Sequence, residues 1–377
     1  MNYSHWEYDS YFNSIDLAIV GGGIVGLNAA IEVKRLNPSL KVMVLEKGVV
    51  LMGASLRNAG FACFGSPSEL LDDLKTRSAE DVFKLVEKRW KGLLALRAIV
   101  GDKNMEYEPL GGYETFDTEE SFNESKDAIS GFNKEISQIT GEKETYKVCD
   151  EKINDFGMKG FTHMIVNKCE AQINTGKMVR TLTAKAAESG VILMNGIELK
   201  EYKEENGSVH LITNWQNFNV KHLLFATNAY TSSILKEVKV KPARAQVLIT
   251  TPINGLKLKG TFHYDKGYYY FRNVGERVLF GGGRNLDFDG ETTTELETTQ
   301  RIQAVLETLL KERIVPGQKY EIERRWSGIM GIGDGDKSPI IKNVSDRVHC
   351  AVRLGGMGVA IGTLVGKEAA AMVLEKL

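Results

Sequence analysis

Three glycines near the start of the chain are spaced as a phosphate-binding turn requires. Residues 21–26 read Gly-Gly-Gly-Ile-Val-Gly, which satisfies the pattern GxGxxG. In such a turn the first glycine permits a tight bend, the second lets the backbone approach a pyrophosphate, and the third lets a helix pack closely on a strand. A helix that begins here directs its free N–H groups and partial positive charge toward the phosphates. These residues are therefore suited to binding a dinucleotide.

An acid stands where a dinucleotide would need one. Glu46 follows Gly26 by about 20 residues, the interval at which a carboxylate accepts hydrogen bonds from ribose hydroxyls. The surrounding pattern predicts a buried strand at 15–20, a helix at 27–36 and a second strand at 41–46. The alternative interpretation, a glycine-rich turn beside a surface glutamate, leaves this β-α-β context unexplained.

Two further segments favour FAD over a nicotinamide cofactor. Residues 53–61 (GASLRNAGF) follow the acid-ended strand and are small enough for the backbone to reach a planar ligand, and residues 354–362 (LGGMGVAIG) open the last predicted helix. A second GxGxxG is missing, because residues 279–287 (LFGGGRNLD) lack the third glycine. We therefore expect one FAD, no separate NAD(P)H site, and electron transfer to oxygen or another external acceptor.

These segments resemble the D-amino-acid oxidase superfamily, which includes glycine oxidase, sarcosine oxidase and γ-glutamylputrescine oxidase. The resembling pieces are VGGGIVGLNAA, VMVLEKG, GASLRNAGF, FATNAY, RWSGIMGIG, SPII and LGGMGVAIG, which begin at residues 20, 42, 53, 225, 325, 338 and 354. The resemblance implies that residues 57–60 lie along the isoalloxazine ring. It also implies that the last glycine-rich turn aims a helix N-terminus at the N1/C2=O edge of the flavin, where a helix dipole stabilises negative charge.

The predicted FAD contacts combine these motif positions with neighbouring backbone. They are Gly21, Gly22, Gly23, Ile24, Val25, Gly26, Glu46, Lys47, Gly53, Ala54, Ser55, Arg57, Asn58, Ala59, Gly60, Phe61, Ile197, Ala226, Thr227, Asn228, Gly328, Gly355, Gly356, Met357, Gly358 and Val359. We expect the flavin to be held non-covalently, because Met330 and Gly331 stand where a linking cysteine would be expected by resemblance to sarcosine oxidase.

The expected fold is α/β, with a Rossmann-type FAD-binding domain and an inserted antiparallel-sheet (α+β) substrate domain. The β-α-β signals lie at both ends of the chain and the strand-rich part lies between them. We therefore expect a discontinuous FAD-binding domain at 1–90, 150–235 and 322–377, and a substrate domain at 91–149 and 236–321.

The resemblance implies oxidation of a C–N bond, with hydride passing to flavin N5 and an imine as the product. The catalytic candidates by resemblance are Tyr269, Arg272 and Trp326, on strands facing the flavin. Alternation allows only two of the four aromatic residues at 268–271 to face one side, and the others would belong to the core of the sheet.

One departure from the family concerns the substrate. Glycine oxidase and D-amino-acid oxidase place an arginine shortly after the Trp/Gly element to clamp a carboxylate, whereas residues 327–333 contain none. This favours a small amine over an α-amino acid, although Arg57, Arg244 or Arg272 could still supply a carboxylate contact. The alternatives to such an enzyme are a flavin-dependent RNA-modifying enzyme and a flavin-binding redox protein without turnover.

The composition of the chain argues against a nucleic-acid-binding protein and against a membrane-spanning one. The 377 residues are 42% hydrophobic and 26% charged, typical of a soluble globular protein, and the net charge of -1 gives no positive field for a nucleic-acid partner. The most apolar stretch, 17–31, is too short to span a bilayer, and residues 1–14 lack the features of a signal peptide. We expect a cytoplasmic protein without a transmembrane segment.

Cysteine and histidine spacing predicts no metal site. The four cysteines form no CxxC, and the six histidines form no HExxH. Cys63 follows the predicted flavin loop and is interpreted as a buried, unreactive thiol.

Overall fold

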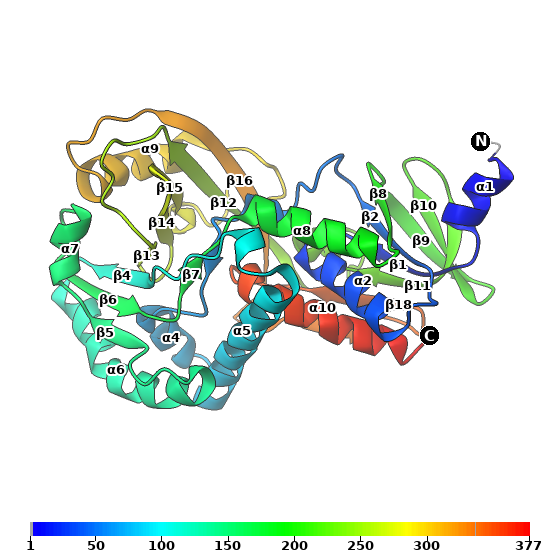
Figure 1. Ribbon diagram of the computed structural model, residues 1–377, viewed down its shortest axis with the longest axis horizontal. Helices are drawn as coiled ribbons and strands as arrows, with labels where there is room; N and C mark the ends of the chain where they lie inside the picture. Colours follow the sequence, from blue (N-terminus) through cyan, green and yellow to red (C-terminus); the bar gives the residue numbers. More distant parts are fainter. Residues whose placement is uncertain (1–2, 336) are drawn as a thin grey trace.

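The computed structural model describes residues 3–335 and 337–377. Figure 1 shows two parts side by side, each built on its own sheet. The first sheet has the strand order β17-β18-β11-β1-β2-β8, with β9 and β10 continuing from β11, and the second has the order β16-β12-β15-β14-β13-β4-β6-β5. The expected α/β fold class is confirmed.

The first sheet is parallel at its centre, where β1 pairs with β2 and β11. Val20, Leu45 and Phe225 lie at the same level, so the carboxyl ends of three strands meet at one edge. The strands of this sheet are β1 (Ile15–Val20), β2 (Val42–Glu46), β8 (Ile192–Asn195), β9 (Leu199–Glu205), β10 (Ser208–Thr213), β11 (Phe218–Phe225), β17 (Ile340–Asn343) and β18 (Val348–Val352).

Helices cover one face of this sheet, and close approach between them depends on glycine. A Cβ at Gly366 in α10 would lie 2.7 Å from the carbonyl oxygen of Val25 in α2, and a Cβ at Gly92 in α5 would lie 2.1 Å from that of Ala360. A single apolar cluster joins these helices to β1 and β2. The helices are α2 (Ile24–Leu36), α5 (Ala79–Val100), α8 (Thr175–Glu188) and α10 (Gly358–Leu374).

The second sheet is mostly antiparallel, with one parallel pair between β4 and β13. One face packs on α7 and α9 through a core that includes Phe262, Phe271 and Phe280. Its strands are β4 (Gly112–Phe116), β5 (Tyr146–Val148), β6 (His163–Asn167), β12 (Lys241–Thr250), β13 (Thr261–Tyr264), β14 (Tyr269–Val274), β15 (Arg277–Gly282) and β16 (Ile322–Ile332).

The remaining elements connect or cover these two layers. They are α1 (His5–Glu7), η1 (Tyr8–Phe12), α3 (Ala54–Arg57), β3 (Phe61–Ala62), α4 (Pro67–Leu74), η2 (Lys103–Met105), α6 (Glu119–Thr140), α7 (Glu151–Phe156), β7 (Ala171–Gln172), η3 (Asn228–Ser233), η4 (Arg284–Leu286), α9 (Gln300–Leu309) and η5 (Leu310–Ile314).

Sheet membership differs from the expected division of the chain. Residues 150–235 and 322–377 were assigned to the FAD-binding domain, yet β6 and β16 lie within the second sheet. Both are long-range pairings, β6 with β4 and β16 with β12, which local patterns do not report. We therefore propose that β6 and the first part of β16 belong to the substrate domain, together with β5, which was already expected there.

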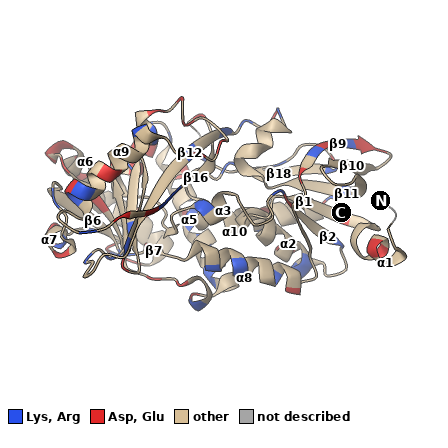
Figure 2. Cartoon of the chain, turned by 90° about the horizontal axis from the view of Figure 1, so that it is seen from above, with Lys and Arg blue, Asp and Glu red and all other residues tan. Residues whose placement is uncertain are grey.

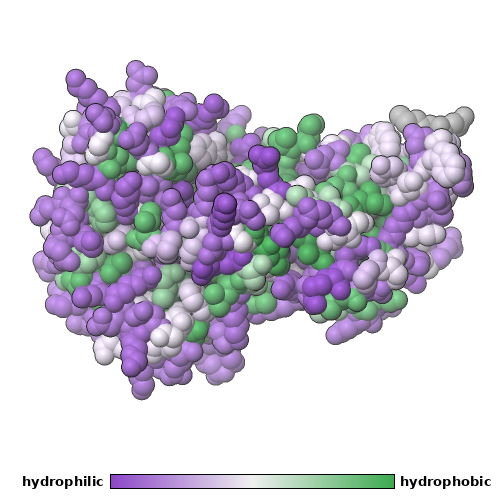
Figure 3. Space-filling view, in the orientation of Figure 1, coloured by the Kyte–Doolittle hydropathy of each residue, from purple (hydrophilic) through white to green (hydrophobic). Residues whose placement is uncertain are grey.

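Charged and apolar side chains are distributed differently over the surface. Figure 2 shows acidic and basic residues interspersed over both parts. Figure 3 shows exposed apolar residues over the loop between β2 and α3, where Val49, Val50 and Met52 are exposed. Within the described ranges, no helix has both the length and the apolar character needed to cross a membrane.

Candidate functional site

The glycine turn after β1 has the compactness that its sequence predicts. Gly21 adopts φ 107°, and a Cβ there would lie 2.7 Å from the carbonyl oxygen of Ala226. A Cβ at Gly26 would lie 2.0 Å from the carbonyl oxygen of Gly21. Neither position therefore tolerates a side chain without movement of backbone, and the turn brings the start of α2 against the end of β1.

Two of the predicted FAD contacts, Glu46 and Ser55, accept hydrogen bonds from the backbone around the start of α2. Glu46 accepts hydrogen bonds from the N–H groups of Gly22 (3.0 Å) and Gly48 (2.9 Å). Ser55 Oγ accepts one from the N–H of Ile24, at 2.9 Å. Gly23 is the N-cap residue and supplies no capping side chain. The first-turn N–H groups of Val25 and Gly26 have no acceptor within the helix, so an anion could take that place.

The loop after α3 is held by its own side chains. Asn58 donates to the carbonyl oxygens of Ala54 (3.0 Å) and Ser55 (2.9 Å), and its Oδ1 accepts from the N–H of Gly60 at 2.8 Å. Ala59 and Gly60 follow, and Phe61 begins the short strand β3, which pairs with β7. The segment expected beside the flavin is therefore a fixed turn.

Arg57 joins this loop to the second sheet. Its guanidinium donates to the carbonyl oxygens of Met52 (3.0 Å) and Ser327 (2.9 Å), and its own carbonyl oxygen accepts from Trp326 Nε1 at 3.0 Å. A Cβ at Gly328 would lie 3.2 Å from the Arg57 Cβ. Arg57, Trp326 and Gly328 are thus brought together at one crossing of α3 and β16.

The late glycine turn is fixed by Asn228. Its Oδ1 accepts from the N–H groups of Arg353 (3.0 Å) and Leu354 (3.3 Å). The N–H of Gly355 donates to the carbonyl oxygen of Gly331 at 3.0 Å. Residues 355–359 then form the turn and first residues of α10, whose N-cap supplies no side-chain cap.

The other predicted contacts lie at the same edge of the first sheet, with one exception. The N–H of Ala226 donates to the carbonyl oxygen of Val20, Thr227 follows it, and the N–H of Ile197 donates to that of Glu46. Lys47 instead points to Glu198, with its Nζ 2.8 Å from Oε1, and its side chain is 73% exposed. We therefore propose no cofactor contact for the Lys47 side chain.

One face of the second sheet is directed toward this edge. Directly paired residues share a face, and His263, Tyr270, Gly281, Val247 and Trp326 lie in line across five strands. The ring centroid of Tyr270 lies 5.9 Å from that of Phe61, in an edge-to-face arrangement. A Cβ at Gly281 would lie 2.6 Å from the Tyr270 ring, so glycine makes room for this aromatic side chain.

Tyr269 lies on the opposite face of the sheet. It is 6% exposed, and its ring centroid lies 5.7 Å from that of Tyr264 and 6.3 Å from that of Phe280. The alternation along β14 thus directs Tyr269 into this core and Tyr270 toward Phe61. We therefore propose Tyr270, in place of the expected Tyr269, for the flavin-side position.

Arg272 is buried and bonded to backbone. Its Nη1 donates to the carbonyl oxygens of Ala59 (3.2 Å), Gly60 (2.9 Å) and Ile173 (2.8 Å). Burial lowers the pKa of Arg272 to about 10, so the group is still a cation at neutral pH. These contacts support a positioning role for Arg272 in the loop beside the flavin.

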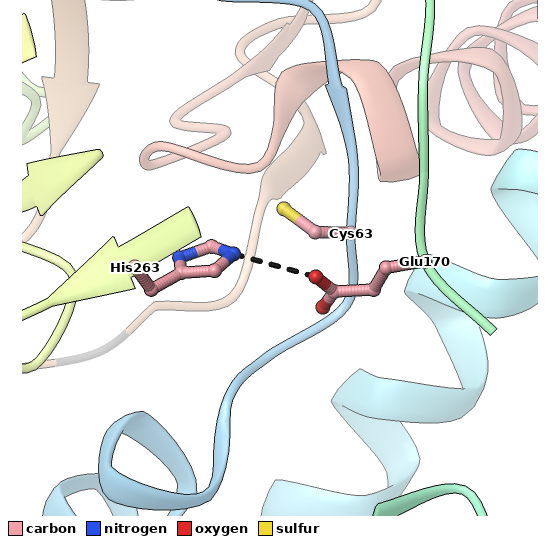
Figure 4. Close-up of side chains that lie close together, drawn as sticks. All are labelled: Cys63, Glu170 and His263. Carbon is pink, nitrogen blue, oxygen red and sulfur yellow. Dashed lines mark hydrogen bonds and ion pairs between the residues drawn. The ribbon is translucent and has the colours of Figure 1, made fainter. Parts of the chain in front are cut away.

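Three buried residues on this side were not predicted as a group. His263 Nε2 lies 3.3 Å from Glu170 Oε2, and Cys63 completes the cluster (Figure 4). Burial lowers the pKa of His263, but the hydrogen bond to Glu170 and the charge of Glu170 outweigh it and raise the pKa to about 9. Residues so far apart in the sequence give no spacing signal, and only the long-range pairing of the sheet brings them together.

A buried acid lies next to this group. Glu114 pairs with His263 across β4 and β13, and it accepts hydrogen bonds from Ser66 Oγ (2.9 Å) and the N–H of Ser68 (3.1 Å). Burial raises the pKa of Glu114 to about 7 despite these bonds. The face directed toward the cofactor edge is therefore partly aromatic and partly titratable.

The arrangement fits FAD. The N-termini of α2 and α10, whose own N-cap residues supply no capping side chain, lie at the carboxyl edge of the parallel sheet, as a pyrophosphate and a flavin edge require. A Cβ at Gly53 or at Gly355 would meet no described atom within 4 Å, so space remains beside both loops. The Glu46 carboxylate lies at the end of β2, within reach of a ribose in this arrangement.

Comparisons with known proteins show which family the chain belongs to. The family model described as "DAO: FAD dependent oxidoreductase" matches residues 16–372. The chain is 23% identical over 378 residues to the probable oxidoreductase OrdL of Rhizobium meliloti (strain 1021), covering 96% of this chain and 83% of that protein. It is 24% identical over 346 residues to the bifunctional protein ThiO/ThiG of Trichormus variabilis, covering 89% of this chain and 48% of that protein. The chain therefore spans about half the length of that bifunctional relative.

Solved structures share the fold at low sequence identity. Glycine oxidase from Geobacillus kaustophilus superposes with a TM-score of 0.75 at 19% identity, covering 96% of this chain and 95% of that chain. L-Proline dehydrogenase from P. horikoshii superposes with a TM-score of 0.75 at 17% identity, covering 96% of this chain and 94% of that chain. With the family match along almost its whole length, the chain belongs to the DAO family of FAD-dependent oxidoreductases.

Proposed function

We propose that this FAD-dependent oxidoreductase oxidises the C–N bond of a small amine. The proposal rests on the aromatic side chains that one face of the second sheet directs toward the carboxyl edge of the first sheet. Tyr270 contacts Phe61 and Trp326 contacts Arg57, so aromatic side chains stand beside the loop expected along the flavin. Such walls exclude water and favour a neutral amine, the form that can lose a hydride.

The arginines near this face support an amine over an α-amino acid. Arg57 and Arg272 donate to backbone carbonyl oxygens. Arg244 forms a buried bidentate pair with Glu291, at 2.9 and 2.7 Å. Each of the three side chains that could have clamped a carboxylate is thus already engaged, and residues 327–333 contain no arginine. A bidentate carboxylate clamp of the kind that α-amino acids require is not provided by these groups.

FAD, when bound, would supply hydride acceptance for oxidation of the carbon that bears nitrogen, which gives an imine as the product. The chain itself positions the reactants. Asn58 and Arg272 hold the loop at 59–61, Asn228 holds the turn before α10, and the N-terminus of that helix stabilises negative charge at its end. Tyr270 and Trp326 orient the substrate and keep water away from it.

The test is anaerobic mixing of the purified holoprotein with two matched panels. One contains small primary and secondary amines, and the other contains the α-amino acids that differ from them by a carboxylate. The proposal expects bleaching of the visible flavin absorption by amines and much slower bleaching by the matched amino acids. Faster reduction by the amino acids contradicts the substrate class. Absence of reduction by either panel would favour a protein that binds flavin without this chemistry.

A further inference from the structure

Cys63, Glu170 and His263 form a buried cluster of three different metal-ligating side chains. Within residues 3–335 and 337–377, no other group of three or more histidine, cysteine or acidic side chains gathers this closely. Cys63 is 5% exposed, Glu170 is 1% exposed and His263 is 5% exposed. Figure 4 shows Glu170 and His263 directed toward each other, with the Cys63 side chain beside the bond that joins them. The residues come from the loop after β3, the turn after β6 and strand β13.

The spacing of these atoms is that of ligands around a small cation. The Nε2 of His263 lies 3.3 Å from Oε2 of Glu170. Two ligand atoms at about 2.0–2.1 Å from zinc in tetrahedral geometry are about 3.3–3.4 Å apart, whereas a charge-assisted N–H···O bond shortens to about 2.7–2.9 Å. One ligand atom from each of the three residues lies within 4.8 Å of the other two, and zinc would need the sulfur at about 3.5–3.6 Å from the nitrogen and oxygen.

The surroundings leave room for the carboxylate and orient it. A Cβ at Gly112 would lie 1.8 Å from Glu170 Oε2, so glycine at this position is needed for the carboxylate to lie where it does. Asn167 Nδ2 donates to Glu170 Oε1 at 3.2 Å, which leaves Oε2 directed at His263. A hydrogen-bonded second shell of this kind is what orients metal ligands in proteins.

We propose that Cys63, Glu170 and His263 bind one divalent ion of the zinc class, with one coordination position left for water or another ligand. Three protein ligands drawn from sulfur, nitrogen and oxygen are the set found in open zinc sites. The site lies at the border of the cofactor region, because Cys63 Sγ is 3.5 Å from Met357 Sδ and the His263 ring centroid is 5.3 Å from that of Phe61.

The experiment uses the oxidised holoprotein after removal of metals by a chelator, with zinc chloride as the probe. Calorimetric titration is expected to give one ion bound per chain. Zinc-edge X-ray absorption is expected to show one sulfur at about 2.3 Å and nitrogen or oxygen neighbours at about 2.0–2.1 Å. Cys63→Ser, Glu170→Gln and His263→Gln should each weaken binding by about 100-fold or more.

Cys169→Ser is the control, since Cys169 is a half-buried thiol outside the set of three proposed ligands and should leave zinc binding unchanged. Retained flavin absorption shows which variants are folded. The proposal would be overturned if zinc does not bind in a stoichiometric amount or if the coordination shell contains no sulfur. It would also be overturned if the three variants bind zinc as tightly as the natural chain does. Because the titration uses no substrate, its failure leaves the proposed amine oxidation untouched, and failure of the amine test leaves the metal site untouched.

Discussion

Arg272 Nη1 donates a hydrogen bond to the carbonyl oxygen of Gly60 at 2.9 Å, which ties β14 of the second sheet to the loop expected along the flavin. The same nitrogen also reaches the carbonyl oxygen of Ile173 at 2.8 Å. One buried cation therefore fixes the distance between the aromatic face that would hold the substrate and the loop that would hold the cofactor.

Removal of the Arg272 guanidinium should destabilise the fold and weaken the binding of FAD. Arg272→Met leaves buried carbonyl oxygens without donors, so the free energy of unfolding should fall by about 2–4 kcal/mol. FAD occupancy should fall with it, as measured by urea unfolding and the flavin-to-protein ratio. Arg277→Met is the control, because Arg277 forms a surface ion pair with Glu323 and should change stability by less than about 1 kcal/mol. Unchanged stability of Arg272→Met, with only a raised KM, would show that Arg272 binds substrate instead.

A methyl group at Gly26 should weaken FAD binding. In Gly26→Ala the new Cβ would lie 2.0 Å from the carbonyl oxygen of Gly21, so the phosphate turn must open. We expect FAD affinity to fall about tenfold or more. Gly131→Ala in α6 is the matched control, since its Cβ meets no described atom within 4 Å and should stabilise the helix by about 0.5–1 kcal/mol. Full flavin content in Gly26→Ala would contradict the assigned turn.

Neighbouring tyrosines on β14 should behave differently. Tyr270→Leu should slow flavin reduction by amine by about tenfold or more, because this side chain faces the loop at Phe61. Tyr269→Phe should keep the reduction rate, since Tyr269 packs in the core on the other face. Rapid anaerobic mixing measures both rates. The reverse order of effects would show that β14 presents its other face to the flavin.

Acid should destabilise the first sheet through a buried histidine pair. Burial, and then the neighbouring His222, lower the pKa of His349 to about 4, and burial also lowers the pKa of His222. The unfolded chain takes up a proton below about pH 6.5, whereas the folded chain resists it until about pH 4. Stability is therefore lost as pH falls through that window, by up to about 3 kcal/mol in total. Urea unfolding at pH 7.5 and 5.0 and a fixed FAD concentration should show a smaller pH effect in His349→Gln than in the natural chain. An equal pH effect in both would contradict the assignment.

The cofactor half of the molecule could be predicted from local pattern. The turn at 21–26, the acid at the end of β2 and the late glycine turn are short motifs that can be recognised within the sequence. The last helix was expected to open within 354–362, and α10 begins at Gly358. Each depends on apolar periodicity and on glycine, which the sequence displays directly.

The substrate half depends on pairing between distant segments. Alternation at 268–271 allowed either phase, and the register of β14 with β13 and β15 selects Tyr270 for the cofactor side. Helix α9 begins only at Gln300, because the threonines before it favour extended and capping conformations. The cluster of Cys63, Glu170 and His263 joins three segments that are remote in sequence. No local spacing could indicate it.

The most direct test of the central claim is the visible spectrum of the purified protein before and after anaerobic addition of small amines. We predict one FAD per chain, released intact by denaturation, and bleaching of its absorption by amines more rapidly than by the matched α-amino acids. A chain that carries no flavin, or a flavin that neither class of compound reduces, would contradict the account.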